Sequence, residues 1–245
     1  MNQETPYISM LLYGVAGTGK SILASTFPNA LILDADNSHR QYQRFFLNNR
    51  YVEPKNCLIA LEKAVTQLQE KGELVSSDGM KMETIVIDSL TNIENLAIAN
   101  LKGFNYQNWG KNLYNGRGKM IQKQDWGGIS GSTIALLTYL RDLPVNLVVI
   151  TQIQTTLDNG VRKYAPNLIG KGADEALHFP DFVGYMSSSE TQEGKKNYLH
   201  LSSSVEDNFI AKSRTVQGAI EPIPSPHYSK IVALLENQKL NLNFN

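Results

Sequence analysis

The residues with the clearest chemical potential lie near the start of the chain, between Gly14 and Ser21. Gly14 is followed by four residues and then by Gly19, Lys20 and Ser21. Glycines let successive backbone N–H groups turn toward one anion, because no Cβ stands in the way. The lysine adds a positive charge, and the serine adds an oxygen ligand for a divalent cation. This spacing therefore predicts a loop that binds the phosphates of a nucleotide together with Mg²⁺.

The segments on either side of this loop are those that such a loop requires. "YISMLLYG" (7–14) is typical of a short buried strand, and "SILASTF" (21–27) is typical of a helix. A helix start directs its backbone N–H groups at the phosphates. We expect Lys20 to reach the β- and γ-phosphates. The predicted nucleotide-binding residues of the loop are Gly14, Val15, Ala16, Gly17, Thr18, Gly19, Lys20, Ser21 and Ile22.

A second carboxylate is needed to help Ser21 hold the metal, and "TIVIDS" (84–89) supplies Asp88. An apolar run carries Asp88 to the carboxyl end of a buried strand, which lies beside the phosphates if the sheet is parallel. The alternative is that Asp88 is an ordinary capping residue at the end of a strand. Its combination with the glycine loop favours the metal-binding interpretation.

The composition indicates a globular chain with no strong electrostatic preference. The 245 residues include 23 Lys and Arg against 23 Asp and Glu, so no net charge attracts nucleic acid or an anionic membrane. The single cysteine, Cys57, excludes an internal disulfide and fits a reducing cytoplasm. No apolar run approaches the ~20 residues of a membrane span.

Strand and helix patterns alternate along the chain. Because the strands are continuous apolar runs separated by helices, we expect one α/β domain with a mainly parallel, doubly wound sheet covered on both faces. Gln152 follows the strand at 145–151 and can reach the γ-phosphate only if that strand lies between the strand of the glycine loop and the strand of Asp88. The expected strands are 7–14, 30–36, 84–89, 145–152, 182–188, 197–203 and 208–213, and the expected helices are 58–71, 90–101, 129–142 and an amphipathic helix at 228–238.

Several segments together resemble a known family. "LILDAD", "IVIDSLTNIE" and "LVVITQIQ" follow the glycine loop in the order found in RecA-type recombination ATPases. "QDWG" (124–127), "LRDLPVN" (140–146) and "AKSR" (211–214) make the chain similar to the small bacteriophage RecA-like ATPases grouped with the Sak-type single-strand annealing proteins. The resemblance covers about residues 7–214. It implies a RecA-like P-loop NTPase fold over 1–245, with 215–245 as a C-terminal segment.

The resemblance also implies roles for individual residues. Asp36 stands where the family places an acidic residue, usually Glu, that orients the attacking water; alternatively, it caps a following helix. Gln152 matches the γ-phosphate sensor, or is a plain polar strand end. Lys212 and Arg214 resemble cations that reach a neighbouring subunit's nucleotide, or form a solvated basic strand. Tyr42 is a candidate for stacking on adenine.

Residues 95–124 lack Asp and Glu but combine cations, aromatics and glycines. Cations neutralise phosphates and aromatics stack on bases, so this composition favours a contact with single-stranded DNA. RecA-type proteins place a first DNA loop here and a second after the sensor, at about 153–172. The alternative is a surface loop that packs on its own core. The candidates are Lys102, Trp109, Lys111, Arg117, Lys119, Arg162, Lys163 and Lys171.

The sequence therefore predicts an ATPase that uses ATP and Mg²⁺, binds single-stranded DNA and promotes annealing or strand exchange. The resemblance implies further copies of the chain in a ring or filament, a single-strand-binding protein as partner, no membrane, and the host cytoplasm as location if a phage encodes it. Two other classes stay open: a small-molecule or nucleotide kinase, which would need an acceptor for turnover, and a nucleotide-dependent switch or scaffold that does not hydrolyse ATP.

Overall fold

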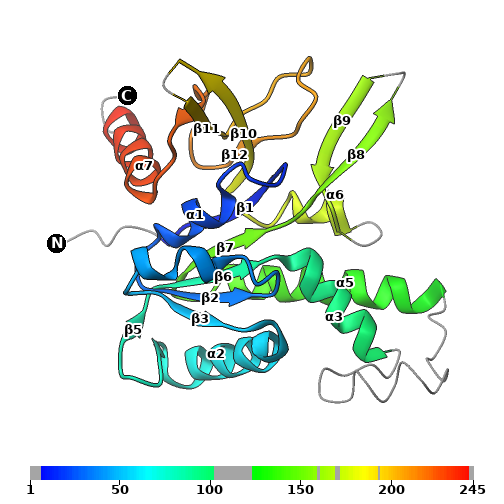
Figure 1. Cartoon of the computed structure of the whole chain (residues 1–245), viewed down its shortest axis with the longest axis vertical. Helices are drawn as coiled ribbons and strands as arrows, with labels where there is room; N and C mark the ends of the chain where they lie inside the picture. The colour runs from blue at the N-terminus through cyan, green and yellow to red at the C-terminus, as the bar shows by residue number, and fades with distance from the viewer. Residues whose placement is uncertain (1–6, 102–122, 159–160, 169–171, 193, 243–245) are drawn as a thin grey trace.

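The computed structural model describes residues 7–101, 123–158, 161–168, 172–192 and 194–242. A central sheet runs through the molecule, and helices cover it (Figure 1). Its strands are β1 (Ser9–Gly14), β2 (Ala30–Asp34), β3 (Arg50–Val52), β6 (Thr84–Asp88), β7 (Asn146–Ile150), β10 (Phe182–Thr191), β11 (Gly194–His200), β12 (Lys212–Ser213) and β13 (Ile223–Pro224). The helices are α1 (Lys20–Ser25), α2 (Cys57–Lys71), α3 (Leu90–Leu101), α5 (Lys123–Arg141), α6 (Gly172–Ala176) and α7 (Tyr228–Leu242).

The spatial order of the sheet is β13-β11-β10-β1-β7-β6-β2-β3, with β12 paired to β10. The strands from β10 to β3 run parallel to one another, and β11, β12 and β13 are antiparallel additions at one side. The predicted α/β class with a mainly parallel sheet is confirmed. The predicted position of β7 between β1 and β6 is also confirmed, since Ile150 pairs with Leu12 on one side and Asp88 on the other.

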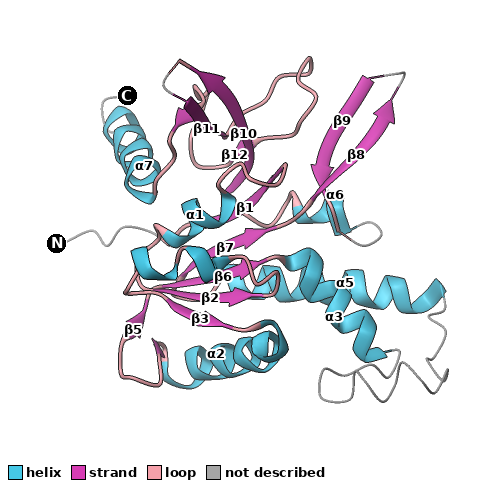
Figure 2. Cartoon of the chain, in the orientation of Figure 1, coloured by secondary structure: helices cyan, strands magenta, loops and turns pink. Residues whose placement is uncertain are grey.

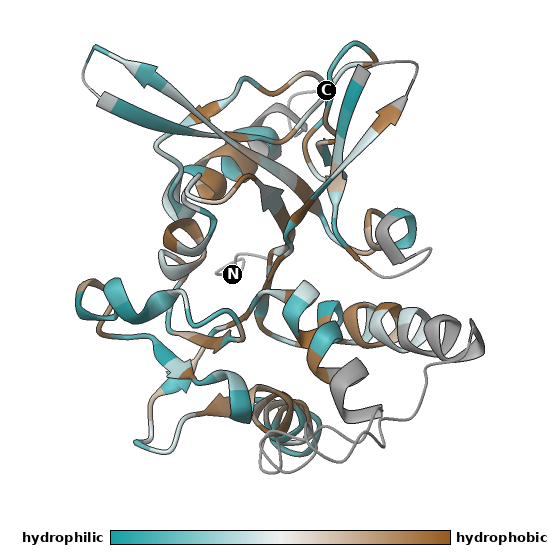
Figure 3. Ribbon diagram, turned by 45° about the vertical axis from the view of Figure 1, so that its right-hand side comes forward, coloured by the Kyte–Doolittle hydropathy of each residue, from teal (hydrophilic) through white to brown (hydrophobic). Residues whose placement is uncertain are grey.

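The sheet buries both faces because its central strands are continuous apolar runs. Alternate residues of β1 and β6 enter different cores: Leu11 and Ile85 face α2, α3 and α5, whereas Leu12 and Val86 face α1 and α7. Figure 3 shows hydrophobic residues along these inner strands. In α7, Ile231 and Leu235 are buried and Leu234 packs against the core, which confirms the predicted amphipathic helix.

Two smaller sheets stand apart from the central one. The first joins β4 (Leu74–Val75) to β5 (Lys81–Met82) after α2. The second is an antiparallel hairpin of β8 (Ile153–Asp158) and β9 (Val161–Pro166), which projects from the body of the molecule (Figure 2). The predicted DNA loop at about 153–172 therefore contains a strand hairpin, and its contact with DNA stays a prediction. β-Branched residues favour strands here, and two residues connect the paired Asp158 and Val161.

The strand expected at 208–213 shortens to Lys212–Ser213. The reason lies in Tyr13, whose hydroxyl donates to Ile210 O at 2.7 Å and accepts from Ile210 N at 2.7 Å. These bonds satisfy the backbone of Ile210 without a neighbouring strand. The strand expected at 197–203 lies a few residues earlier, at β11. The single domain over 1–245 stays a prediction.

Candidate nucleotide site

The glycine loop lies between the carboxyl end of β1 and the start of α1, as the sequence predicts. Gly14, Gly17 and Gly19 have φ angles of 147°, 78° and 87°. A Cβ on Gly14 would lie 2.3 Å from Met186 O of β10, so this position accepts no side chain. The loop is therefore built on backbone geometry and close packing that require glycine.

Lys20 folds back over the loop. Its Nζ donates to Gly14 O at 2.8 Å and to Val15 O at 3.0 Å. Burial lowers the pKa of Lys20, although the negative charges of Asp88 and Asp36 act in the opposite direction. The ammonium group thus stands at the loop with two nearby carboxylates, where it can exchange carbonyl oxygens for phosphate oxygens.

Asp88 ends β6 and lies directly beside the loop. Its Oδ2 accepts hydrogen bonds from Ser21 Oγ at 2.5 Å, His39 Nε2 at 2.8 Å and Ser38 Oγ at 3.2 Å. Burial raises the pKa of Asp88, but the donors from His39, Ser21 and Ser38 outweigh it, so the pKa falls below its usual value. The side chain is therefore a buried carboxylate rather than a neutral acid.

The Ser21 hydroxyl and the Asp88 carboxylate are the hard oxygen donors that Mg²⁺ prefers. Their 2.5 Å separation shows that residues from two distant segments meet at one point. Within the described part of the chain, no group of three or more His, Cys, Asp and Glu could hold a metal by itself. Mg²⁺ is usually held by one or two protein oxygens together with phosphates and water, and Ser21 and Asp88 supply two such oxygens.

Asp36 lies just after β2 at the same edge of the sheet. Its Oδ1 accepts from Ser89 N at 3.1 Å, Ser89 Oγ at 2.7 Å and Asn92 Nδ2 at 2.6 Å. Asp36 thus caps the start of α3, which comes later in the chain. The turn that follows β2 is capped instead by Asp34, whose carboxylate accepts from the backbone N–H groups of Ser38 and His39 at 2.8 and 3.1 Å.

A cavity of about 420 Å³ connects most of the predicted residues. Gln152 follows β7 and lines this cavity with Tyr42, while its backbone N–H donates to Thr91 Oγ1 at 3.0 Å. Val15 and Thr18 do not line it: Thr18 is buried, and its hydroxyl donates to Val15 O at 2.8 Å. The lining includes Gly14, Ala16, Gly17, Gly19, Lys20, Ser21, Ile22, Asp36, Tyr42, Asp88 and Gln152.

Lys212 and Arg214 lie away from this cavity. Lys212 pairs with Val183, which pairs with Leu11, three residues before the end of β1. The two cations therefore lie toward the opposite end of the sheet from the glycine loop. Burial and the nearby charge of Arg214 lower the pKa of Lys212. Their contact with a neighbouring subunit stays a prediction.

The predicted DNA-binding residues divide into two groups. Arg162 and Lys163 lie on β9 with exposed side chains. The other six lie outside the described residues, and so does most of the predicted first DNA loop. These six are Lys102, Trp109, Lys111, Arg117, Lys119 and Lys171.

Sequence reasoning missed several residues that contact the site. His39 and Ser38 contact Asp88, and Lys195 of β11 donates its Nζ to Gly17 O at 2.9 Å. Asn197 packs so closely that its Nδ2 lies 2.7 Å from the point where a Cβ of Gly19 would stand. Lys195 and Asn197 follow the loop by almost 180 residues, so no local pattern points to them. His39 directly follows "DADNS", three residues after Asp36. This closeness to Asp36 is the one feature of the sequence that points to a place for His39 near the site.

The fold and the site together define a nucleotide-binding P-loop protein. The chain belongs to a family of AAA domains, whose model matches residues 7–215. A solved structure of a KaiC-like protein from the hyperthermophilic archaeon Pyrococcus horikoshii is similar, with 16% sequence identity and a TM-score of 0.46. The match covers 89% of this chain and 84% of that chain. A comparison with curated proteins finds no significant match. Among the described residues, no helix is long and apolar enough to cross a membrane.

Proposed function

We propose that this protein is a RecA-like, Mg²⁺-dependent ATPase that binds single-stranded DNA and promotes annealing or strand exchange. The observation that carries the ATPase part is the meeting of Lys20, Ser21, Asp88, Asp36 and Gln152 at one cavity. These residues end or follow four different strands, β1, β2, β6 and β7, and together they supply a cation, a metal-binding pair, a carboxylate that can orient water and a polar sensor. A general phosphate site would require the glycine loop alone.

Each side chain has a defined task in this proposal. Lys20 binds the β- and γ-phosphates, and Ser21 and Asp88 hold Mg²⁺, which neutralises phosphate charge when it is bound. Asp36 orients the attacking water, and Tyr42 stacks on the adenine. Gln152 contacts the γ-phosphate. Because β8 begins at the next residue, a movement of Gln152 on nucleotide binding would also move β8.

The second candidate is a nucleotide-dependent switch that does not hydrolyse ATP. One observation favours it: Asp36 Oδ1 already accepts three hydrogen bonds from Ser89 and Asn92, so this oxygen is occupied by the protein rather than open to an attacking water. Measured turnover separates the two functions, because a switch would bind ATP without releasing phosphate. Turnover that requires a small acceptor would instead indicate a kinase.

The DNA-binding part of the proposal rests on two segments. Residues 95–124 carry cations and aromatics without a single acid, and the β8–β9 hairpin presents Arg162 and Lys163 on an exposed strand. The hairpin starts directly after Gln152. Nucleotide bound at Gln152 and DNA bound at the hairpin would therefore both influence the position of β8. Assembly into a ring or filament would bring Lys212 and Arg214 to a neighbouring nucleotide site. A single-strand-binding protein is the proposed additional partner.

The experiment is a measurement of ATP hydrolysis and DNA binding on the same preparations. Fluorescence anisotropy with a labelled oligonucleotide is recorded over a salt series, and sedimentation with and without DNA reports the assembly. Replacing Lys111, Arg117 and Lys119 by Ala should flatten the log–log salt slope by about 0.7 for each lost phosphate contact. Trp109→Ala should weaken binding by about 1–3 kcal/mol with little change in slope, because stacking releases no ions.

Variants are compared only where their melting temperatures match that of the parent. A triple variant that binds DNA as tightly as the parent at every salt concentration would show that 95–124 is not the DNA site. Trp109→Ala could instead lower the melting temperature and ATP binding together, and this result would assign Trp109 to the protein core.

A further inference from the structure

His39 is a buried residue beneath the metal-binding edge of the site, and none of the roles above includes it. Its exposed fraction is 0%, and its Nε2 lies 2.8 Å from Asp88 Oδ2. An ionised carboxylate only accepts hydrogen bonds, so the proton of this bond must be on Nε2. The other ring nitrogen, Nδ1, lies 3.3 Å from Ser25 Oγ. His39 thereby connects the strand end that carries Asp88 to the last turn of α1.

The position of the imidazole is fixed from several sides. Asp34 accepts the backbone N–H groups of Ser38 and His39, which holds the turn that carries the ring. Tyr51 packs on one side of the imidazole, with ring centroids 5.5 Å apart, and Tyr42 lies edge-on at 6.5 Å. The ring therefore needs no ligand to stay in place, and its hydrogen bond to Asp88 is preorganised.

His39 differs from the two other donors to Asp88 Oδ2. Ser21 and Ser38 line the cavity, so their hydroxyls can turn toward a metal ion or its waters when these bind. His39 does not line the cavity and lies behind the carboxylate. When the hydroxyls turn away, the imidazole still holds Asp88. A hydrogen bond of this kind fixes the orientation of a ligand and tunes its affinity for the metal.

We propose that His39 is a positioning residue that orients Asp88 for Mg²⁺, so the Mg²⁺ requirement of nucleotide binding depends on its Nε2 donor. The proposal rests on the nucleotide site assigned under the proposed function. It concerns a hydrogen bond to the carboxylate, and it assigns His39 no contact with nucleotide or metal.

Two substitutions separate the donor from the bulk of the ring. In His39→Gln, the side-chain amide nitrogen can occupy the place of Nε2 and donate to Asp88. In His39→Asn, the shorter side chain places its amide near Nδ1, where it meets Ser25 but not Asp88. The two variants therefore have similar polarity and burial, but only His39→Gln keeps a donor to Asp88.

The measurement is calorimetric binding of a non-hydrolysable ATP analogue at fixed pH over a Mg²⁺ series, with melting temperatures as the folding control. Mg²⁺ should increase the affinity for the analogue, and the Mg²⁺ concentration that gives half of this increase should be about 10–100-fold higher for His39→Asn than for the parent. This is the usual cost of losing a hydrogen bond to a metal ligand. His39→Gln should stay within a few-fold of the parent. Analogue affinity without Mg²⁺ should be unchanged in both variants, because neither touches the phosphate-binding loop.

An unchanged Mg²⁺ requirement in folded His39→Asn overturns the proposal and leaves the nucleotide site standing. Equal losses in both variants also overturn it, since the donor would then not matter. A parent that binds no analogue at any Mg²⁺ concentration overturns the proposed function itself. If His39→Asn does not fold, nitrogen-15 NMR of the parent decides: the Nε2–H resonance of His39 should shift when Mg²⁺ joins bound analogue, and an unmoved resonance overturns the proposal.

Discussion

The nucleotide site and the β8–β9 hairpin are neighbours along the chain but are built in different ways. At the site, Asp88, Asp34 and His39 are buried, and each is hydrogen-bonded. On the hairpin, Leu157 is 74% exposed, and Arg162 and Lys163 are exposed as well. The site is therefore preorganised before any ligand binds, whereas the outer part of the hairpin gains little from burial.

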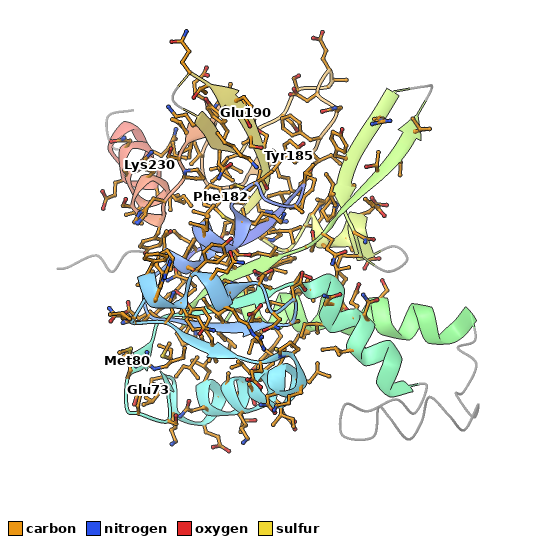
Figure 4. The ribbon with its side chains drawn as sticks, in the orientation of Figure 1. Glu73, Met80, Phe182, Tyr185, Glu190 and Lys230 are labelled. Atoms are coloured by element: carbon orange, nitrogen blue, oxygen red, sulfur yellow. The ribbon has the colours of Figure 1, made fainter. Side chains whose placement is uncertain are left out.

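The base of the hairpin is the exception, because aromatic residues anchor it to the body. Tyr164 stacks on Tyr185 with ring centroids 6.1 Å apart and planes 9° from parallel, and its backbone N–H donates to Asn208 O at 2.7 Å. Tyr185 lies on β10 at the side that meets β9 (Figure 4) and stacks on Phe209 at 4.4 Å. The base of the hairpin is thus anchored to the body, and its first strand, β8, directly follows Gln152.

A large loss of turnover is expected from Asp88→Asn. The asparagine oxygen can still accept from Ser21 and His39, so the fold should survive, but the charge that binds Mg²⁺ is gone. Turnover of ATP should fall about 10²–10³-fold, as for the loss of one preorganised electrostatic contact. Steady-state phosphate release and a melting curve check this. Turnover within tenfold of the parent would contradict the assignment of Asp88 to the metal.

A smaller effect is expected at the root of the hairpin. Tyr164→Ala removes the stacking on Tyr185 and should lower the free energy of unfolding by about 1–2 kcal/mol. Tyr164→Phe is the matched control, because it keeps the ring and should behave like the parent. Urea denaturation measures the stability. Nucleotide affinity should stay within about threefold in both variants, since Tyr164 does not line the cavity. A parallel loss of affinity would show that site and hairpin are not independent.

The smallest effect concerns the exposed cations of β9. If the hairpin contacts single-stranded DNA, replacing Arg162 and Lys163 by Ala should flatten the log–log salt slope by about 0.7 for each lost phosphate contact. Lys55→Ala is the control, because Lys55 is an exposed lysine that pairs with Glu53 on a different part of the molecule. Equal salt slopes for the parent and both variants would remove the hairpin from the proposed DNA site.

The same contrast explains what the sequence could predict. The glycine loop, Asp88 and Gln152 follow from local patterns: each ends an apolar strand, and parallel strands bring their carboxyl ends to one edge. Once the order of the strands in the sheet is known, the position of these residues at one cavity follows from it. The β8–β9 hairpin also has a local signal in the sequence, because Asn159-Gly160 stands between two β-rich runs.

His39 and Lys195 could not be predicted in the same way. The contact between His39 and Asp88 depends on a turn capped by Asp34 and on the burial of an imidazole among neighbours from several elements. Lys195 reaches Gly17 because β11 folds back along β10, and this contact joins residues that lie 178 positions apart in the chain. Such contacts arise from tertiary packing, which residue types and spacing do not encode locally.

The most direct test of the central claim is phosphate release from ATP with and without Mg²⁺, for the parent and for Lys20→Ala. Lys20 is half-buried and bonds only to loop carbonyls among its described hydrogen bonds, so its removal should leave the melting temperature nearly unchanged. We expect Mg²⁺-dependent release by the parent and none above background by the variant. Release by Lys20→Ala at the parental rate would contradict the claim that this loop is the site of ATP hydrolysis.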